Sequence, residues 1–525
     1  MRGKRAAALL LAALLPACKV GPNFKPPREA VPGQYAGIKN PPPASAPQPS
    51  SAAPVPSFWW REFHDPELDS LVDAARRGNL DLKDAYLRIV EARIQVQSAR
   101  AQGLPHLDAS ASYTREQLGL AGILKSKGID TASGPASSAA AQGLIASLEQ
   151  PVNLYQLGFD ASWEIDLFGK VRRAVEAADA QSAAAVASRD DLLVSLEAEV
   201  AQNYFQLRSS QALLQITRDE IAAQREIAEL TQNRHEHGLA DEPDVDSARG
   251  QLGSLEAQLP PYEQSIAASR HALAVLIGQP PESLDARFGD HGELPALPAS
   301  VPVGVPSTLA RRRPDIRNSE ATLHAATAEI GVSIAGLFPD ISLAGTYGLR
   351  NLGTRYLFDW SSHFYTFGPS VSLPIFQGGT LIASVRLSRA QAAEAALSYR
   401  KTVLGALQEV EDGLSALDAD ARRIAALQQT VGADQRAVEL ESNAYRHGVI
   451  SYISVMTAQL QAIQARQQLA ESRLTQSTDL VKLYKALGGG WEDAPGGDAP
   501  AGGAAPGGAA PAAGGAAGAK IGEKP

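Results

Sequence analysis

Two long stretches without proline constrain the fold of this chain more than any other feature of its sequence. Residues 170–234 include 65 positions without proline, and residues 380–447 include 68. At about 1.5 Å per residue, each stretch would form a helix about 100 Å long. A compact globular domain has no room for rods of this length, so we predict an elongated molecule.

Each long stretch is followed by a shorter helical stretch that we predict to run back alongside it. These return stretches are residues 243–276 and 452–487. Apolar residues recur at spacings of three and four along the first rod, which is typical of a coiled-coil seam. Pro260-Pro261 should kink or break the first return helix, whereas the second return stretch contains no proline.

The body of the chain is duplicated. His237-Gly238 recurs as His447-Gly448, and the same offset of 210 relates Gly278 to Gly488. A period above 200 residues indicates a two-fold duplication and not a short-repeat solenoid. We place the first repeat at residues 58–290 and the second at 291–491.

Each repeat is predicted to contain a helix, two strands and a helical hairpin. In the first repeat the strands lie at about 105–119 and 152–168, and the hairpin at 170–277. In the second repeat the helix lies at 306–337, the strands at about 339–351 and 364–376, and the hairpin at 379–487.

The predicted strands alternate apolar and polar residues. From Tyr155 to Leu167 the odd positions are apolar and the even positions are polar or glycine, without a break. A half-buried soluble sheet would show the same pattern, but no other predicted element is available to cover the apolar faces. We therefore expect membrane strands, which need about 9–11 residues.

Strands in lipid must pair all their backbone groups, so they close into a barrel. Four strands per chain are too few, because the smallest membrane barrels use about eight. A dimer would give a barrel largely filled by side chains, whereas a trimer gives twelve strands around an aqueous interior. The sequence thus predicts a mixed α/β membrane protein that acts as a conduit. Long coiled-coil-like α-hairpins form a helical tunnel, and four β-strands per chain complete a 12-stranded barrel in a homotrimer.

The N-terminus indicates export and lipid attachment. Residues 1–17 have the basic start and short apolar run of a signal peptide. Cys18, the single cysteine, would become the first mature residue, and residues 15–18 resemble a bacterial lipobox; a plain signal peptide with an incidental cysteine is the alternative. An acyl group on Cys18 would anchor the chain in outer-membrane lipid without spanning it. Lys19, in place of an aspartate, favours the outer membrane over the inner one.

Low-complexity segments flank the duplicated body. Residues 18–57 are rich in Pro, Ala and Ser and are predicted to form an extended, lipidated tether. Residues 492–525 are mostly Gly, Ala and Pro, and this tail is predicted to be disordered.

Four spaced motifs between residues 58 and 491 carry a resemblance to a known family. They are Phe63-His64-Asp65-Pro66-Glu67-Leu68, Trp163-Glu164-Ile165-Asp166-Leu167-Phe168-Gly169-Lys170, Arg312-Arg313-Pro314-Asp315-Ile316-Arg317 and Tyr484-Lys485-Ala486-Leu487-Gly488-Gly489-Gly490-Trp491. Together they resemble the outer-membrane efflux proteins, the TolC-like exit ducts, and most closely the lipoprotein branch that serves resistance–nodulation–division (RND) pumps. The resemblance implies a trimer with a 12-stranded outer-membrane barrel, a 12-helix periplasmic tunnel and an equatorial belt. It also implies a periplasmic adaptor protein and an inner-membrane RND-type pump as partners.

The resemblance also places a gate at the hairpin turns, here residues 235–247 and 445–457. The RND branch commonly carries an aspartate in the second turn region and an arginine three residues later. The matching positions here are Thr457 and Leu460, so that charged pair is missing. Tyr445 and Arg446 do match the family, and Ile453 lies where an apolar plug residue is usual.

Acidic residues crowd the first turn instead: Asp241, Glu242, Asp244 and Asp246. Two interpretations stay open and can both hold. In one, the acids form a ring that narrows the entrance together with Ile453 and Leu460. In the other, they cap the helix that starts near Pro243.

Other chemistry finds little support in the sequence. The net charge of −9 argues against nucleic-acid binding, and we find no phosphate loop, dinucleotide fingerprint or nucleophile elbow. His235 and His237 are spaced poorly for a metal site. We therefore predict no enzyme, no cofactor and no metal. Glu197, Glu199 and Glu409 are candidates to line the tunnel, where acids favour cations.

The predicted function is passive export of small molecules through an outer-membrane duct, driven by an inner-membrane partner. Two alternatives remain at this point: a duct of the same fold for type I protein secretion, and a periplasmic coiled-coil scaffold lipoprotein without a pore. The sequence identifies neither the exported molecules nor the individual adaptor and pump.

Overall fold

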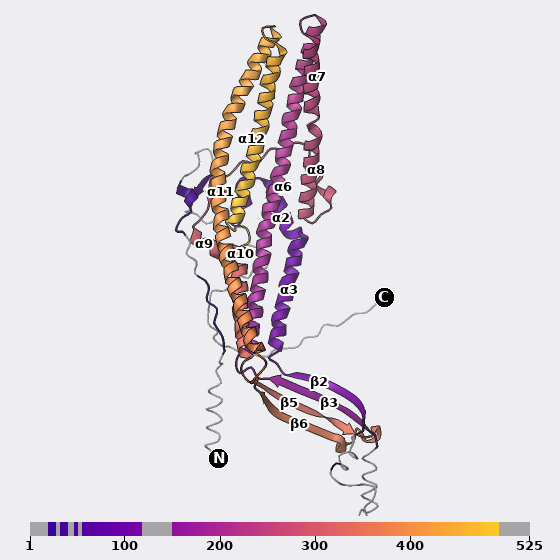
Figure 1. The fold of residues 1–525 in the computed structure, drawn as a ribbon. Coiled ribbons are helices and arrows are strands. Elements are labelled where there is room, and N and C mark those ends of the chain that lie inside the picture. The colour runs from indigo at the N-terminus through magenta and orange to yellow at the C-terminus, as the bar shows by residue number, and fades with distance from the viewer. Residues whose placement is uncertain are drawn as a thin grey trace, which may run out of the picture.

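The computed structural model describes residues 19–27, 32–39, 47–50, 55–117, 126 and 150–492. The predicted signal peptide, Cys18 and residues 493–525 of the tail lie outside this part of the chain. The molecule is elongated, with long helices standing side by side at one end and a small sheet at the other (Figure 1).

The two repeats follow one another along the chain. The α-helices are α2 (Pro66–Gly78), α3 (Leu80–Ala101), α6 (Lys170–Glu236), α7 (Glu242–Glu256), α8 (Leu259–Leu276), α9 (Pro306–Arg312), α10 (Pro314–Ala335), α11 (Thr380–Arg446) and α12 (Tyr452–Ala486). The strands are β1 (Gln48–Ser50), β2 (His106–Glu116), β3 (Val152–Glu164), β4 (Ser300–Pro302), β5 (Asp340–Asn351) and β6 (His363–Ser372). Short 3₁₀ helices lie in the connections at Ala36–Lys39, Trp59–Phe63, Pro281–Leu284, Thr354–Tyr356 and Trp360–Ser362. None of the helices in the described residues is long and apolar enough to cross a bilayer.

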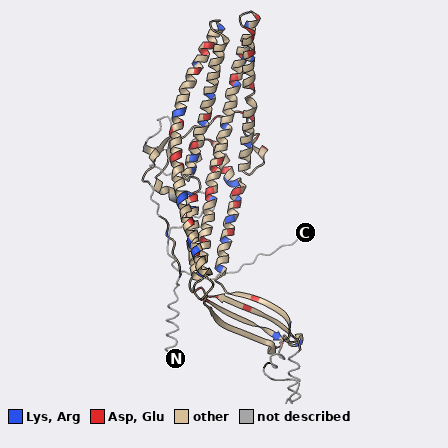
Figure 2. Ribbon diagram, viewed as in Figure 1, with Lys and Arg blue, Asp and Glu red and all other residues tan. Residues whose placement is uncertain are grey.

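The four longer strands form one antiparallel sheet in the order β2-β3-β5-β6. The pairing of β3 with β5 joins the first repeat to the second, with Gly158 opposite Gly348 and Phe159 opposite Tyr347. One face is apolar and exposed in the single chain, and includes Leu107, Phe159, Tyr347, Tyr365 and Phe367. Figure 2 shows few charged residues on these strands, in contrast to the helices.

The sheet connects to the two long helices through glycines at equivalent positions. Gly169 precedes α6 with φ +82°, and Gly379 precedes α11 with φ +86°. These left-handed conformations favour glycine, and the two positions are 210 residues apart, the same offset that relates the hairpin turns. Both junctions therefore repeat one backbone design.

Several element boundaries differ from the sequence prediction, whereas one predicted break is confirmed. The expected helix over 306–337 is divided into α9 and α10, because Arg313 is extended (ψ 125°) before Pro314. The strands predicted at 105–119, 152–168 and 364–376 are shorter than expected and end at Glu116, Glu164 and Ser372. The break predicted at Pro260-Pro261 is present, since α7 ends at Glu256 and α8 begins at Leu259.

The main core lies where α2, α6, α8, α10, α11 and α12 meet. Trp59 and Tyr484 are fully buried there and stack with their ring centroids 5.2 Å apart. The described parts of the predicted tether pack against this body: Tyr35 is buried, and β1 pairs in parallel with β4. These parts are therefore not a free extended tether, because they bury apolar side chains against the helices. The high content of Pro, Ala and Ser in the segment did not indicate this burial.

Candidate channel entrance and membrane junction

The two hairpin turns have the same backbone geometry. Gly238 has φ +71° and Gly448 has φ +74°. In each turn the residue after the glycine donates its N–H to a carbonyl in the last turn of the long helix, Leu239 to Arg234 and Val449 to Ala444. The histidine before each glycine also contacts a carbonyl through Nδ1, at 2.7 Å in the first turn and 2.8 Å in the second.

Tyr445 joins the two hairpins near their tips. Its side chain is 3% exposed, and its hydroxyl donates to Oγ1 of Thr231 on α6 at 3.1 Å. Nη1 of Arg234 donates to the main-chain oxygen of Tyr445 at 2.7 Å, and the guanidinium lies 4.7 Å from the centre of the Tyr445 ring. A charged donor and an aromatic face thus hold the end of α11 against the end of α6.

A second link lies about two helical turns deeper along α6. Nε2 of Gln224 on α6 donates to the Tyr452 hydroxyl and to the Ala248 main-chain oxygen, both at 3.1 Å. Burial raises the pKa of Tyr452, so its hydroxyl stays neutral near pH 7. Tyr445, Tyr452, Ile227, Ala248 and Val455 form a small buried apolar cluster around these bonds.

The other predicted residues of the second turn are exposed in the single chain. Ile453 is 62% exposed and Leu460 is 43% exposed. Thr457 uses its hydroxyl locally, donating to the Ile453 main-chain oxygen at 2.8 Å. Arg446 is exposed, directly after the buried Tyr445. Tyr445 therefore makes its contacts within one chain, whereas the exposed Ile453 and Leu460 are accessible to another surface.

The acidic residues of the first turn lie at the start of α7. Asp241 occupies the N-cap position but its side chain makes no capping hydrogen bond. Glu242 and Asp244 lie in the first turn of the helix, where the helix dipole stabilises their negative charges. Asp246 is exposed and lies 4.0 Å from Arg249. The acids thus supply negative charge at the tip without the hydrogen bonds of a cap.

Sequence reasoning assigned no role to Arg234, Thr231 and Gln224. The duplication offers a signal for them, because the equivalent positions 210 residues later hold Ala444, Glu441 and Asp434. The repeats therefore differ at the positions where the first hairpin holds the second. Tyr452, which the predicted turn range included, corresponds to Glu242.

A second constellation lies at the other end of the helices, beside the sheet. Residues 19–24, here called the N-terminal strap, lie across α6 and α10. The fully buried Arg173 donates to the main-chain oxygens of Val20 (3.0 Å) and Gly21 (3.1 Å) and to Oδ1 of Asn23 (2.9 Å). Phe24 stacks on His324 with centroids 4.4 Å apart. The strap is therefore bound immediately after Cys18, at the strand-to-helix junction.

Glu176 links the strap to both repeats. Its carboxylate contacts Lys19 at 2.5 Å, Arg173 at 2.8 Å and His324 at 3.2 Å. Partial burial favours the neutral acid, but hydrogen bonds from Lys19, His324 and Arg173 outweigh this and lower the pKa of Glu176 to about 2. The carboxylate is consequently charged at any physiological pH.

One candidate tunnel residue is placed elsewhere. Glu197 is fully buried in the core, 3.3 Å from Arg76, and burial raises its pKa well above the ordinary value. It therefore does not line a tunnel. Glu199 is exposed, and Glu409 is more than half exposed and accepts a hydrogen bond from Arg313 at 2.6 Å.

Comparison with known proteins gives the family. The sequence model of a protein family described as "Outer membrane efflux protein" matches residues 71–279 and 305–489. The chain belongs to the outer membrane efflux protein family. The two matched ranges correspond to the two repeats found in the sequence. The resemblance that the four sequence motifs carry is thereby confirmed.

Curated relatives of this efflux protein match it over nearly its whole length. The probable efflux pump outer membrane protein TtgC of Pseudomonas putida is 31% identical over 487 residues, which cover 92% of this chain and 95% of TtgC. The outer membrane protein OprJ of Pseudomonas aeruginosa is 30% identical over 488 residues, which cover 93% of this chain and 96% of OprJ.

Solved channels share the fold. The outer-membrane channel OprN has 31% identity and a TM-score of 0.78, covering 90% of this chain and all of OprN. The open state of the MtrE outer membrane channel of Neisseria gonorrhoeae has 27% identity and a TM-score of 0.72, covering 90% and 99%. The protein is thus an outer-membrane efflux channel of a Gram-negative bacterium, in which three copies complete a helical tunnel and a barrel. It works with an efflux pump, and its relatives are channel proteins and not enzymes.

Proposed function

We propose that this efflux protein is the lipid-anchored exit duct of a tripartite pump, closed at its periplasmic end by the two hairpin tips. The observation that carries the proposal is the placement of two specialised ends on uninterrupted helices. An exposed apolar sheet lies at one end of α6 and α11, and a bonded pair of turns lies at the other.

The bound strap supports lipid attachment at Cys18. Lys19, the residue after Cys18 in the sequence, is held at the strand-to-helix junction by Glu176. An acyl chain on Cys18 would enter the membrane beside the sheet whose apolar face needs lipid. A Cys18→Ala variant should lose incorporation of radiolabelled palmitate; retained label would place the lipid elsewhere.

Exposed apolar rows support assembly of the helices with other copies. Leu80, Leu87 and Ile94 follow one exposed side of α3, and Leu387 and Leu397 are exposed on α11. Figure 1 shows α3 and α11 on opposite sides of α6. Such rows are expected to be covered in a ring of hairpins, because contiguous exposed apolar surface favours association.

The tips support closure of the tunnel. The second turn presents Ile453 and Leu460, and the first presents Asp241, Asp244 and Asp246. Replacing both Asp244 and Asp246 by alanine should raise single-channel conductance in planar bilayers if the acids narrow the entrance. Glu226→Gln, an exposed acid farther along α6, is the matched control and should conduct as the wild type does. Unchanged conductance in the double variant would remove the acids from the gate.

Names of relatives favour small molecules as cargo. They include an antibiotic efflux pump protein, ArpC, and toluene and solvent efflux pump proteins, TtgC and SrpC, all from Pseudomonas putida. We therefore propose a periplasmic adaptor and an inner-membrane RND-type pump as partners. Deletion should increase susceptibility to antibiotics or solvents, and adaptor and pump should co-purify with the tagged channel. Loss of a secreted protein with unchanged drug susceptibility would favour type I secretion instead.

A further inference from the structure

A buried carboxylate lies between the two hairpins, apart from the tip contacts. Glu220 of α6 has a side chain that is 4% exposed, and both its oxygens lack a hydrogen-bond partner in the described residues. Its nearest cation is Nη1 of Arg466 on α12, at 3.9 Å. This distance is too long for a hydrogen bond, so the ionised acid is only partly compensated.

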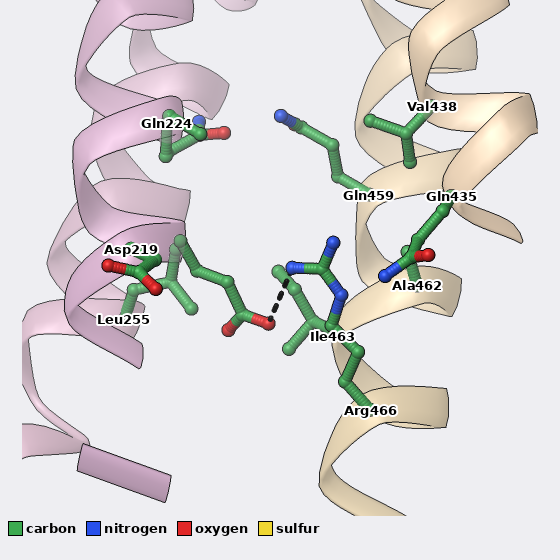
Figure 3. A pocket seen from close by; sticks show the side chains of 11 residues that line it. Asp219, Gln224, Leu255, Gln435, Val438, Gln459, Ala462, Ile463 and Arg466 are labelled. Carbon is green, nitrogen blue, oxygen red and sulfur yellow. Dashed lines mark ion pairs between the residues drawn. The ribbon is translucent and has the colours of Figure 1, made fainter. Parts of the chain in front are cut away.

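A cavity of about 150 Å³ adjoins this acid between α6 on one side and α11 and α12 on the other. Figure 3 shows Arg466 and Gln459 reaching from the second hairpin toward the first. Gln435 of α11 accepts two hydrogen bonds from Arg466 once its amide is oriented to match, at 3.1 and 3.0 Å. The Gln459 amide oxygen is buried without a donor. The part of the cavity lined by Glu220 and Gln224 on one side and by Gln459 and Arg466 on the other is here called the seam.

The surroundings of Glu220 favour its neutral form. Burial is the main cause, Arg466 opposes it, and Asp219 on the same helix adds to it, so the pKa of Glu220 rises to about 7. Tyr262 on α8 is the other titratable group that interacts with Glu220, whereas α7 contributes Leu255 and α11 contributes Gln435 and Val438. Arg466 is 36% exposed and can keep its charge in water when Glu220 is neutral.

We propose that Glu220 is a proton-controlled latch that holds the two hairpins together along the seam. The protonated acid fits the closed seam, because a neutral carboxyl is less costly to bury without hydrogen-bond partners than an ionised one. The ionised acid is poorly solvated there and favours separation of α6 from α12.

The direction of the pH effect follows from proton linkage. An acid with a raised pKa binds its proton more tightly in the closed seam than when exposed to water, where its pKa is about 4.5. The closed seam is therefore fully favoured below about pH 4.5, and this advantage is lost as pH rises through about 7. The full span corresponds to a change on the order of 100-fold in the ratio of closed to open seam.

The test measures the seam directly in the full-length channel in detergent. Nitroxide labels at Ala222→Cys on α6 and Gln464→Cys on α12, both exposed, report the distance between the helices. We expect a short distance within each chain at pH 5 and a growing longer population at pH 8. Single-label samples at Ala222→Cys and at Gln464→Cys identify signals between copies of the chain and any signal from Cys18.

Variants separate the latch from a general pH effect. Glu220→Gln, a neutral isostere, should keep the short distance at both pH values, whereas Glu226→Gln should respond as the wild type does. Arg466→Gln removes the cation that lowers the pKa of Glu220, so the transition should move to higher pH. This second variant decides the matter if Glu220→Gln fails to assemble.

Two results would overturn the latch: a wild-type distance that does not change between pH 5 and 8, or an unchanged pH response in Glu220→Gln. Conductance across the same pH range should rise with the longer population. The label distance depends on the seam alone, whereas conductance also depends on the proposed exit duct. A responsive seam in a protein that forms no pore would therefore refute only the duct.

Discussion

The two hairpins share one turn and differ in almost everything that follows it. Gly238 and Gly448 have nearly equal backbone angles and equivalent hydrogen bonds. After the turn, the first hairpin continues with acids and a helix interrupted near Pro260, whereas the second continues with apolar residues and the single helix α12. Duplication has preserved the backbone that reverses the chain, while the surface presented at the tip has diverged. The first hairpin supplies charge and holds its neighbour, and the second supplies apolar bulk.

The largest loss of local stability is expected from removing the contacts by which Arg234 of the first hairpin holds Tyr445 of the second. Arg234→Ala would lose a charge-assisted hydrogen bond and a ring contact to Tyr445, at a cost of about 2 kcal/mol. Native-state hydrogen exchange around Tyr445 should report faster local opening. Arg446→Ala, at the exposed position one residue after Tyr445, is the matched control. Equal effects of the two variants would contradict the role of Arg234 in holding the two hairpins together.

The shared turn gives the next effect. Valine at Gly238 or at Gly448 would force a β-branched residue into a left-handed conformation, at a cost of about 1–2 kcal/mol. A Cβ atom at Gly238 would meet open space, and one at Gly448 would make only an ordinary contact with Nη2 of Arg234 at 3.6 Å, so the two costs should be similar. Hydrogen exchange of each turn measures them, with Gly289→Val as a control at an open position without positive φ. A clear difference between the two turns would show that the duplication has not preserved the turn energetics.

A smaller effect is expected from a single neutral hydrogen bond. Tyr445→Phe would keep the ring in its buried cluster and remove only the bond to Thr231, at a cost of about 1 kcal/mol. Thr231 would still donate to the Ile227 main-chain oxygen. The shift in local opening of α11 relative to wild type measures this cost. A loss as large as that of Arg234→Ala would mean that the hydroxyl, and not the guanidinium, holds the joint.

The smallest effect on stability is expected at the acidic tip. Asp246 and Arg249 are both largely exposed and 4.0 Å apart, and exposed pairs contribute little. Asp246→Asn should leave thermal stability unchanged and reduce the preference of the pore for cations, measured from reversal potentials in a salt gradient. A stability loss without a change in selectivity would make the first tip a structural element only.

Most of the fold was predictable because its elements carry strong local patterns. The alternation from Tyr155 gave the strand β3, the stretch without proline gave α6, and Pro260-Pro261 marked the interrupted return helix. The division of the helix at Arg313 was also predictable from Pro314, but the helical pattern on both sides of this proline favoured one continuous helix. The family resemblance was available from motifs and is now supported by matches over both repeats.

The contacts between hairpins were much less predictable. Arg234 meets the Tyr445 carbonyl across 211 residues of sequence, and Gln224 meets Tyr452 across 228. Such pairs depend on the relative height and rotation of two long helices, which no local pattern specifies. The burial of Glu197 and Glu220 was unpredictable for the same reason, since their sequence neighbours resemble those of exposed helical acids. Only the packing of distant segments removes them from water.

The unbroken length of α6 and α11 has a mechanical consequence. Each has 67 residues between a glycine joint at the sheet and a turn at the tip, a lever arm of about 100 Å. A tilt of about one degree at the joint moves the far end by about 2 Å. The opening between the hairpin tips can therefore change by about the width of a water molecule while every hydrogen bond within α6 and α11 stays intact. A partner protein would need to tilt the helices only slightly at the sheet end to produce this change.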